Sequence, residues 1–560
     1  MNPKKTNIST LPELSSEFIE FVHLMLWEKP WKFFLLVFAM LAGYGAKLVT
    51  LSYNNDNIYA ISKSSPWALL THHRYGNTLM SLIGLRDREI FFWSTWIGLA
   101  TTVAAGLLLA FYFFKISSRK LKIDALYLLL LCFCLYPMRM ESMVYPCAGM
   151  GFGTVSVVLA LLLISSRKEN CNWKKHLSII ALLVFAISSY EVYATMFLVG
   201  FLAALFLQIY LGEKLSWRQL GNVFCLHVLY VILAIIAWGV LIFLSQALNL
   251  YVPGSGPARD ILWLGNIQSL THALLRLIPD LFGYFVWNSL FYFALLELWF
   301  AAAIAVYFTS KKRQYCAKLS LILLLMFLSM FALSIIQCKA QPYRTCQAFA
   351  VFVCFFFMLF YHRHGSRNFI VNLAFVFIIF FQSKELALMS KIERESSEYA
   401  TYCFRTLGHE IKQEFPDHAQ REVVVIGYSR DWPKTSGRDT MQPPFFYSKH
   451  MLGHYQSIGL QQFYVDFHEQ SPLLLKYHTG ISAKKLSDEE RLHWSQIVAE
   501  AKQPAWPAKG YIQEYDKQIV VNMGLAEAPK SSEFWLQMLG YLKPFLGENL
   551  QQKLLRQLTL

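Results

Sequence analysis

Long apolar runs separated by short polar loops fill the first two-thirds of the chain. A bilayer core of roughly 30 Å needs about 20 helical residues to cross it. Backbone polar groups in lipid must also be hydrogen-bonded within their own segment, so the runs predict helices. About eleven spans are expected, near residues 31–52, 89–115, 124–138, 145–166, 177–190, 192–211, 220–247, 288–308, 319–337, 347–361 and 368–382.

After residue 382 the pattern changes to that of a small water-soluble α/β domain. It begins with a helical segment over about 384–415, and Glu422–Tyr428 (EVVVIGY) reads as a buried strand. Ser487–Ala501 reads as a helix and Tyr511–Met523 as a hairpin that turns at Asp516-Lys517. The tail 532–558 is apolar at helical spacing and is expected to form an amphipathic helix.

The fold class predicted is therefore an all-α polytopic membrane domain, residues 31–382, followed by an extracytoplasmic α/β domain, residues 383–560. The amino-terminal segment 1–30 is too polar for a cleaved signal peptide. Within it, Leu11–Trp27 has helical apolar spacing with Glu13, Glu17 and Glu20 on its polar side. We expect this helix to lie along the cytoplasmic membrane surface.

The charge distribution supports the membrane assignment. Of the 560 residues 55% are hydrophobic and 16% are charged, whereas soluble proteins carry about a quarter charged residues. Residues 1–382 hold 30 Lys+Arg against 15 Asp+Glu, which accounts for the whole net charge of +15. These basic residues lie in short loops between apolar runs, so membrane topology explains them better than nucleic-acid binding does.

Positive residues collect on the cytoplasmic side of membrane proteins. Alternate short loops carry them: Lys115, Arg119, Lys120, Lys122, then Arg167, Lys168, Lys174, Lys175, then Lys214, Arg218, then Lys311, Lys312, Arg313, Lys318, then Arg363 and Arg367. This places the amino terminus in the cytoplasm and the carboxy-terminal domain outside. This orientation also requires a tight reversal at Tyr190-Glu191. A single crossing over 177–211 would invert the predicted orientation of every later span and of the carboxy-terminal domain.

Two predicted external loops, 53–88 and 248–287, are long and contain helix-like stretches expected at the membrane interface. Most acids of the membrane half lie at span ends, several of them on the outer face, and no internal repeat of the transporter kind is visible. These features favour an enzyme with an external site over a transporter. The chain contains no GxxxxGK[ST] motif, no CxxC pair and no HExxH motif, so neither a cofactor nor a metal is expected.

Three short segments carry a family resemblance: YNNDN at 53–57, HHRYGN at 72–77 and SSYEVY at 188–193. With the overall hydropathy, they make the chain similar to the serotype-converting O-antigen glucosyltransferase (Gtr) family, integral-membrane glycosyltransferases of the GT-C type. The resemblance implies transfer of a hexose, most often glucose, from a polyprenyl-phosphate donor to O-antigen, lipopolysaccharide or another lipid-linked cell-surface glycan. It also implies a periplasmic active site and a multi-pass location in the bacterial inner membrane. The paired acids of the family's first loop are replaced here by Asn55-Asp56.

This chemistry needs a carboxylate that accepts the proton of the acceptor hydroxyl, and cations for the departing lipid phosphate. Asp56 is the first candidate base, although a helix cap explains it equally well. Glu191, at the predicted reversal, and Glu141 are the other candidate acids, although Glu141 also suits a local ion pair with Arg139. The candidate phosphate-binding residues are Arg74, Arg139, Lys339 and Arg344. Arg74, Lys339 and Arg344 also suit interfacial anchors.

Two other functions remain open from the sequence. An O-antigen polymerase or ligase is also polytopic and also uses lipid-linked sugars. A transporter or flippase would be polytopic without being an enzyme.

Overall fold

The computed structural model describes residues 11–49, 75–82, 91–136, 148–165, 173–248, 250, 316–332, 347–365, 368–426, 472 and 474–523. The chain divides into two compact units. The first unit contains Met1–Arg394 and Pro443–Tyr455, and the second contains Glu395–Gln442 and Gln456–Leu560.

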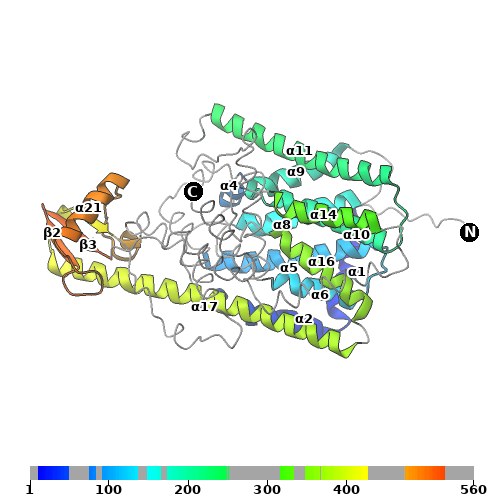
Figure 1. Cartoon of the computed structure of the whole chain (residues 1–560), viewed down its shortest axis with the longest axis horizontal. Helices are drawn as coiled ribbons and strands as arrows, with labels where there is room; N and C mark the ends of the chain where they lie inside the picture. The colour runs from blue at the N-terminus through cyan, green and yellow to red at the C-terminus, as the bar shows by residue number, and fades with distance from the viewer. Residues whose placement is uncertain are drawn as a thin grey trace, which may run out of the picture. The chain divides into compact units, whose positions relative to one another are not determined.

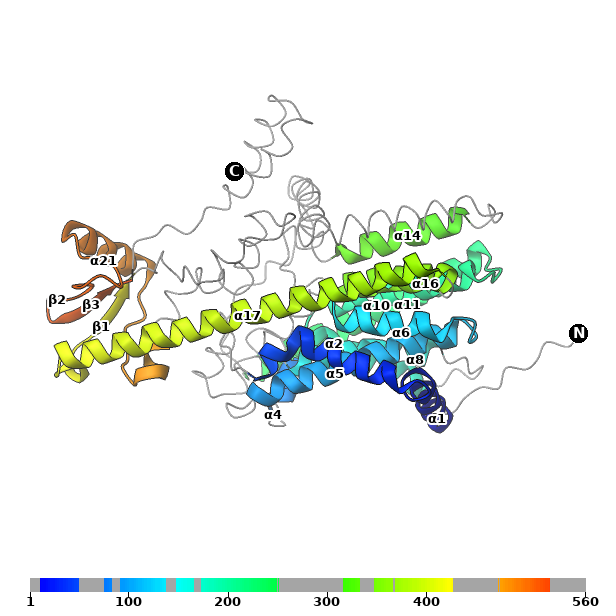
Figure 2. The ribbon, with the colours of Figure 1, turned by 90° about the horizontal axis from the view of Figure 1, so that it is seen from below.

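Helices make up the described part of the first unit (Figures 1 and 2). They are α1 (Leu11–Val22), α2 (Pro30–Val49), α4 (Tyr75–Leu82), α5 (Phe91–Ile116), α6 (Ile123–Cys134), α8 (Ala148–Ser165), α9 (Trp173–Ser189), α10 (Tyr193–Tyr210), α11 (Trp217–Ala247), α14 (Cys316–Met330), α16 (Gln347–His364) and the first part of α17 (Phe369–Glu414). Every predicted span within the described residues coincides with one of these helices. The span predicted at 288–308 lies outside the described residues.

Three of these helices, in the described part of the chain, are long and apolar enough to cross a membrane: Thr95–Ile116, Tyr193–Tyr210 and Trp217–Ala247. Others are apolar over a shorter length, among them Pro30–Gly45, Ile123–Cys134 and Gly151–Ser165. Their lengths and composition are those of a membrane protein. The number of crossings and their direction stay predictions.

The chain reverses direction at Tyr190–Val192, as predicted. On α8, Gly153 lies against the ring of Tyr193 and Leu161 lies against Gly200. The later residue of α8, Leu161, contacts the later residue of α10, Gly200. The two helices therefore run in the same direction. The intervening helix α9 must therefore run the opposite way, and α9 and α10 form the two arms of the expected hairpin.

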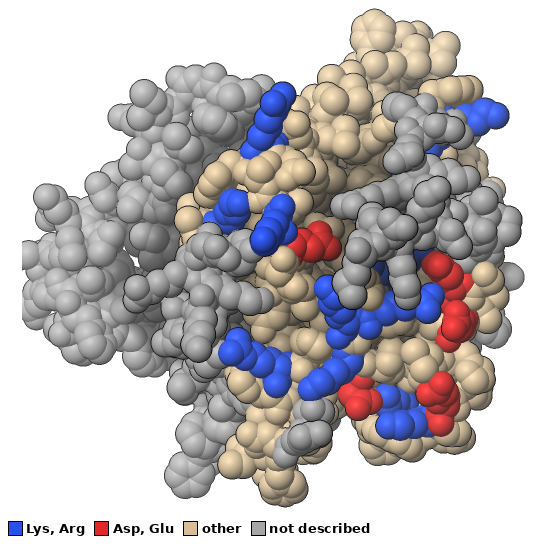
Figure 3. All heavy atoms as spheres, turned by 90° about the vertical axis from the view of Figure 1, so that its right-hand side faces the viewer, with Lys and Arg blue, Asp and Glu red and all other residues tan. Residues whose placement is uncertain are grey.

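The described residues of the predicted basic loops lie at one end of the first unit, where Lys and Arg side chains gather (Figure 3). We call this the basic end and define it by Lys32, Lys115, Arg119, Lys122 and Lys318. Contacts between segments distant in sequence hold it together. Lys32 Nζ lies 2.6 Å from Asp124 Oδ1, and the Lys122 backbone N–H donates to His362 Nδ1 at 3.2 Å. The gathering agrees with the loop pattern from which a cytoplasmic face was predicted.

The predicted amino-terminal helix is present, and it packs against the end of α5. Phe21, in α1, is buried and its ring lies 5.0 Å from that of Phe114. Glu17, on the polar side, pairs with Lys115 at 2.6 Å and with Arg119 at 4.0 Å. A single turn of π-helix, His23–Trp27, then leads from α1 toward α2. The segment is thus anchored by both its apolar and its acidic face.

Helix α17 joins two predicted helical segments. The sequence pattern indicated a span ending at 382 and a helical segment over about 384–415, and in the structure both belong to α17, which is continuous from Phe369 to Glu414. Leu386 packs on Gly43 of α2, where a built Cβ would lie only 3.1 Å from its Cδ1. Ser390 donates a hydrogen bond to the Gly43 carbonyl at 3.4 Å. These contacts continue the packing of the membrane helix beyond the point where its sequence turns polar.

The second unit contains the carboxy-terminal part of α17, a three-stranded sheet and α21 (Asp488–Glu500). The sheet has the order β1-β3-β2 (Val423–Ile426, Gln518–Asn522, Ile512–Tyr515), with β1 parallel and β2 antiparallel to β3. Asp516 and Lys517 both have positive φ, at 47° and 67°, as a two-residue type I′ turn requires. The predicted strand and hairpin are confirmed.

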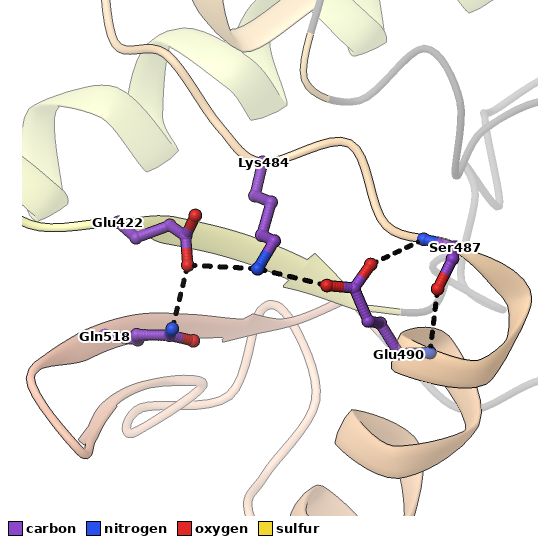
Figure 4. A network of polar contacts seen from close by, with 5 residues as sticks. All are labelled: Glu422, Lys484, Ser487, Glu490 and Gln518. Carbon is purple, nitrogen blue, oxygen red and sulfur yellow. Dashed lines mark hydrogen bonds and ion pairs between the residues drawn. The ribbon is translucent and has the colours of Figure 1, made fainter.

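A polar network joins α21 to the sheet (Figure 4). Ser487 caps the helix by accepting from the Glu490 N–H at 3.2 Å, and Glu490 accepts from the Ser487 N–H at 2.8 Å. Lys484 lies between Glu490, at 3.1 Å, and Glu422, at 3.4 Å, and Gln518 donates to Glu422 at 2.8 Å. Hydrogen bonds with Glu490 and then Glu422 raise the pKa of Lys484, and the Ser487 N–H lowers the pKa of Glu490. The network is therefore a structural one.

Candidate functional site

Two of the motif segments meet at the end of the first unit opposite the basic end. Helix α4 contains Tyr75 and Gly76 of the HHRYGN segment, and the SSYEVY segment closes α9 and opens α10. The backbone N–H of Gly76 donates to Ser188 Oγ at 3.2 Å. We call this region the α4 end and define it by α4, residues 188–193 and Ser245.

Gly76 allows α4 to lie directly on α9. A Cβ built on Gly76 would lie 2.0 Å from Ser189 Oγ and 2.8 Å from the backbone oxygen of Phe185. Neither distance is tolerable, and the backbone oxygen belongs to a packed helix that cannot move cheaply. A residue without a side chain is therefore required at position 76.

Tyr75 attaches α4 to a second helix. Its hydroxyl lies 2.6 Å from Ser245 Oγ, in the last turn of α11. Ser245 donates its own proton to the Ile242 carbonyl at 2.8 Å. A serine hydroxyl has one proton to give, so Tyr75 is the donor in the pair. The bond ties a helix within the first predicted external loop to the last turn of α11, just before the second predicted loop.

Tyr193, the last residue of SSYEVY, is buried where α10 meets α8. Its ring occupies the space that a side chain at Gly153 would need, since a built Cβ would lie 2.4 Å from the ring. Thr154 Oγ1 donates to the Tyr193 hydroxyl at 3.3 Å. The start of α10 is thus fixed in place, and the turn before it is fixed too.

Glu191 lies in that turn, between the buried residues Tyr190 and Val192. Its side chain is partly exposed, and its backbone oxygen accepts from the Ala194 N–H at 3.1 Å. A partly exposed carboxylate on a fixed turn can exchange a proton with a group that reaches it. Of the predicted site residues, Glu191 is the one that the described residues include. The others lie outside them: Asp56, Arg74, Arg139, Glu141, Lys339 and Arg344.

Tyr75, Gly76 and Ser188 belong to the motif segments, but the sequence alone predicted no individual role for them. Their signal was the motifs themselves, because nothing in a single sequence indicates that two such segments touch. Ser245 lay within an apolar run and carried no signal at all. Among the described residues, no three His, Cys, Asp or Glu side chains are grouped so as to hold a metal ion.

Comparison with known proteins supplies a family. No curated protein and no solved structure matches the chain. The family model of the glucosyl transferase GtrII, however, matches residues 45–361. That range is more than half of the 560 residues, and it contains α4, the Tyr190–Val192 turn and all three motif segments. The resemblance seen in those motifs is confirmed, and the chain belongs to the glucosyl transferase GtrII family.

Proposed function

We propose that this glycosyltransferase moves glucose from a polyprenyl-phosphate donor to O-antigen or another cell-surface glycan, at the periplasmic face of the bacterial inner membrane. The family supports glucosyl transfer. The apolar helices support a membrane location. A sugar activated on a lipid phosphate needs no nucleotide site at the enzyme, which agrees with the absence of a phosphate-loop motif from the sequence.

The single observation that carries the proposed site is the contact of HHRYGN with SSYEVY at the α4 end. One segment contains a candidate cation, Arg74, and the other a candidate acid, Glu191. Arg74 directly precedes Tyr75, which is hydrogen-bonded to α11. A cation for the leaving phosphate and a carboxylate for the acceptor hydroxyl are the two groups that the reaction needs.

In the proposed reaction a carboxylate takes the proton of the acceptor hydroxyl as its oxygen bonds to the anomeric carbon. The bond from that carbon to the phosphate oxygen breaks, and the electron pair stays on the lipid phosphate. Asp56 is the proposed base, with Glu141 and Glu191 as the other acids of the site. Arg74, Arg139, Lys339 and Arg344 are proposed to balance the charge that grows on the phosphate.

The proposal is tested by the mass of surface polysaccharide from cells with and without the protein. Transfer adds the mass of one hexose to the repeat unit. A change in chain length alone would instead indicate a polymerase, and an unchanged polysaccharide would contradict both. Feeding labelled polyprenyl-phosphate glucose to the purified protein then tests the donor directly.

Arg74→Ala is expected to weaken donor binding and to slow turnover, because a charge-assisted hydrogen bond to the phosphate is lost. Arg74→Lys should retain part of both, since it keeps the charge without the two-pronged geometry. The measurement is donor affinity and transfer rate with purified variants. If Arg74→Ala binds the donor as tightly as the parent, the residue is only an interface anchor.

The orientation is tested by reporter fusion. Because α17 is continuous through position 383, the fusion point belongs after Glu414. Alkaline phosphatase attached there should be active, since the second unit is expected outside the cytoplasm. Green fluorescent protein at the same position should stay dark. The reverse pair of results would place the basic end outside and overturn the topology.

A further inference from the structure

Two hydrogen bonds from adjacent residues attach the first turn of α4 to two different helices. The Gly76 N–H donates to Ser188 Oγ, in the last turn of α9, at 3.2 Å. The Tyr75 hydroxyl donates to Ser245 Oγ, in the last turn of α11, at 2.6 Å. Both accepting serines are buried, so water competes little for either bond. The start of α4 is therefore a bridge between α9 and α11.

Helices α9 and α11 also contact each other nearer their starts. The His176 ring of α9 is hydrogen-bonded to the Tyr230 hydroxyl of α11, and the two rings stack with their centres 5.8 Å apart. Following each helix onward from this contact leads to Ser188 in α9 and to Ser245 in α11. The two helices therefore run in the same direction, and α4 crosses between their last turns.

The second bond fixes what the first leaves free. A single hydrogen bond at Gly76 would allow the start of α4 to pivot on α9, and the bond from Tyr75 to α11 prevents this pivot. Arg74 is the residue before Tyr75, and a trans peptide bond holds consecutive Cα atoms about 3.8 Å apart. The backbone from which the Arg74 side chain extends is therefore set by how Tyr75 is held. Because a guanidinium lies at the far end of a long side chain, a small rotation of that backbone displaces it greatly.

We propose that Tyr75 and Ser245 are positioning residues for donor binding, whose hydrogen bond fixes the backbone from which Arg74 reaches the lipid phosphate. The inference rests on the proposed function and gives Ser245, a residue far from the motif segments, a part in it. Neither residue is required to touch the donor. A hydrogen bond between uncharged groups is worth about two- to tenfold in an equilibrium constant, and the donor affinity should depend on this bond by about that factor.

The test uses the purified full-length protein in detergent, with polyprenyl phosphate and neutral polyprenol as probes. The rise in melting temperature with probe concentration gives an affinity separate from the intrinsic stability of each variant. Tyr75→Phe removes the bridging hydroxyl and leaves Ser245 bonded to the Ile242 carbonyl. Tyr75→Phe and Ser245→Ala should each bind polyprenyl phosphate about two- to tenfold more weakly and bind polyprenol as the parent does. Ser245→Thr, which keeps the hydroxyl, should recover part of the affinity.

The matched control is Ser165→Ala. Ser165 lies in the last turn of α8 and donates to the Leu162 carbonyl at 2.8 Å, the same local bond that Ser245 makes with Ile242. Within the residues that the structure describes, the Ser165 hydroxyl binds only that carbonyl. Its loss should leave the affinity for polyprenyl phosphate unchanged.

Arg74→Ala tests whether the bond acts through the arginine. If it does, adding Ser245→Ala to Arg74→Ala should weaken binding no further, because the group being positioned is already gone. Tyr75→Phe takes the place of Ser245→Ala in both backgrounds if the serine variant fails to accumulate.

The outcomes separate the inference from the function on which it rests. If Tyr75→Phe binds polyprenyl phosphate as the parent does, or if the loss persists undiminished in the Arg74→Ala background, the bond only stabilises α4 and the inference alone is wrong. If the parent binds polyprenyl phosphate no more tightly than polyprenol, the lipid-phosphate donor of the proposed function fails, and the inference fails with it.

Discussion

Replacing Asp56 with Asn is expected to lower glucosyl transfer by about a hundred- to ten-thousand-fold, the usual worth of a general base. Asn keeps the size and hydrogen-bonding shape of Asp and removes its basicity. A helix cap would behave differently, because Asn caps a helix as well as Asp does. The single substitution therefore separates the two interpretations of Asp56. The measurement is transfer rate per amount of protein in the membrane.

The control makes the same chemical change elsewhere. Asp417, in the second unit, forms an exposed pair with Arg421 at 2.7 Å, and Asp417→Asn should leave transfer unchanged because such a pair contributes little. Near-normal transfer by Asp56→Asn would make Asp56 a cap. Glu141→Gln and Glu191→Gln would then be compared, and the acid whose loss removes activity at constant protein level would be the base.

Local signals in the sequence predicted most of the described elements. The helix predicted over Ser487–Ala501 has its cap at Ser487 and ends at Glu500, because Ser followed three residues later by Glu satisfies the first N–H groups of a helix. The hairpin turn at Asp516-Lys517 was equally local. The apolar runs located the membrane helices, including the reversal at Tyr190–Val192, since loop charge on both sides required it.

Contacts between distant segments could not be predicted in this way. An apolar period identifies the buried face of a helix but not the helix that covers it. The bond from Tyr75 to Ser245, 170 positions away, has no local signature. The continuity of α17 past the boundary expected near 382 was not predictable for a related reason. The sequence turns polar there, but helical geometry continues, and packing of Leu386 on Gly43 supports it.

The sequence predicts the proposed site only as a set of residue types. The chemistry of transfer from a lipid phosphate asks for acids and cations near the outer face, and the sequence offers several of each. Glu191 is placed by the structure at the α4 end. The choice among the remaining acids rests on the substitutions described above, because the described residues do not include them.

Gly76→Ala is expected to reduce transfer about ten- to a hundredfold while the protein still accumulates in the membrane. The new Cβ would lie 2.0 Å from Ser189 Oγ and 2.8 Å from the Phe185 oxygen. Helix α4 must therefore move off α9, breaking the bond from the Gly76 N–H to Ser188. Displacing a catalytic group by even 1 Å can cost about a hundredfold in rate. Transfer rate and melting temperature are measured together.

Two further variants make this result specific. Gly239, an exposed residue of α11, has open space around a built Cβ, so Gly239→Ala should leave both transfer and melting temperature close to those of the parent. Ser189→Gly removes two of the three atoms that a Cβ at position 76 would meet, and only the Phe185 oxygen remains. Combined with Gly76→Ala it should restore part of the lost activity. If Gly76→Ala transfers glucose at the parental rate, the seating of α4 on α9 does not position the reaction, and the α4 end is not the site.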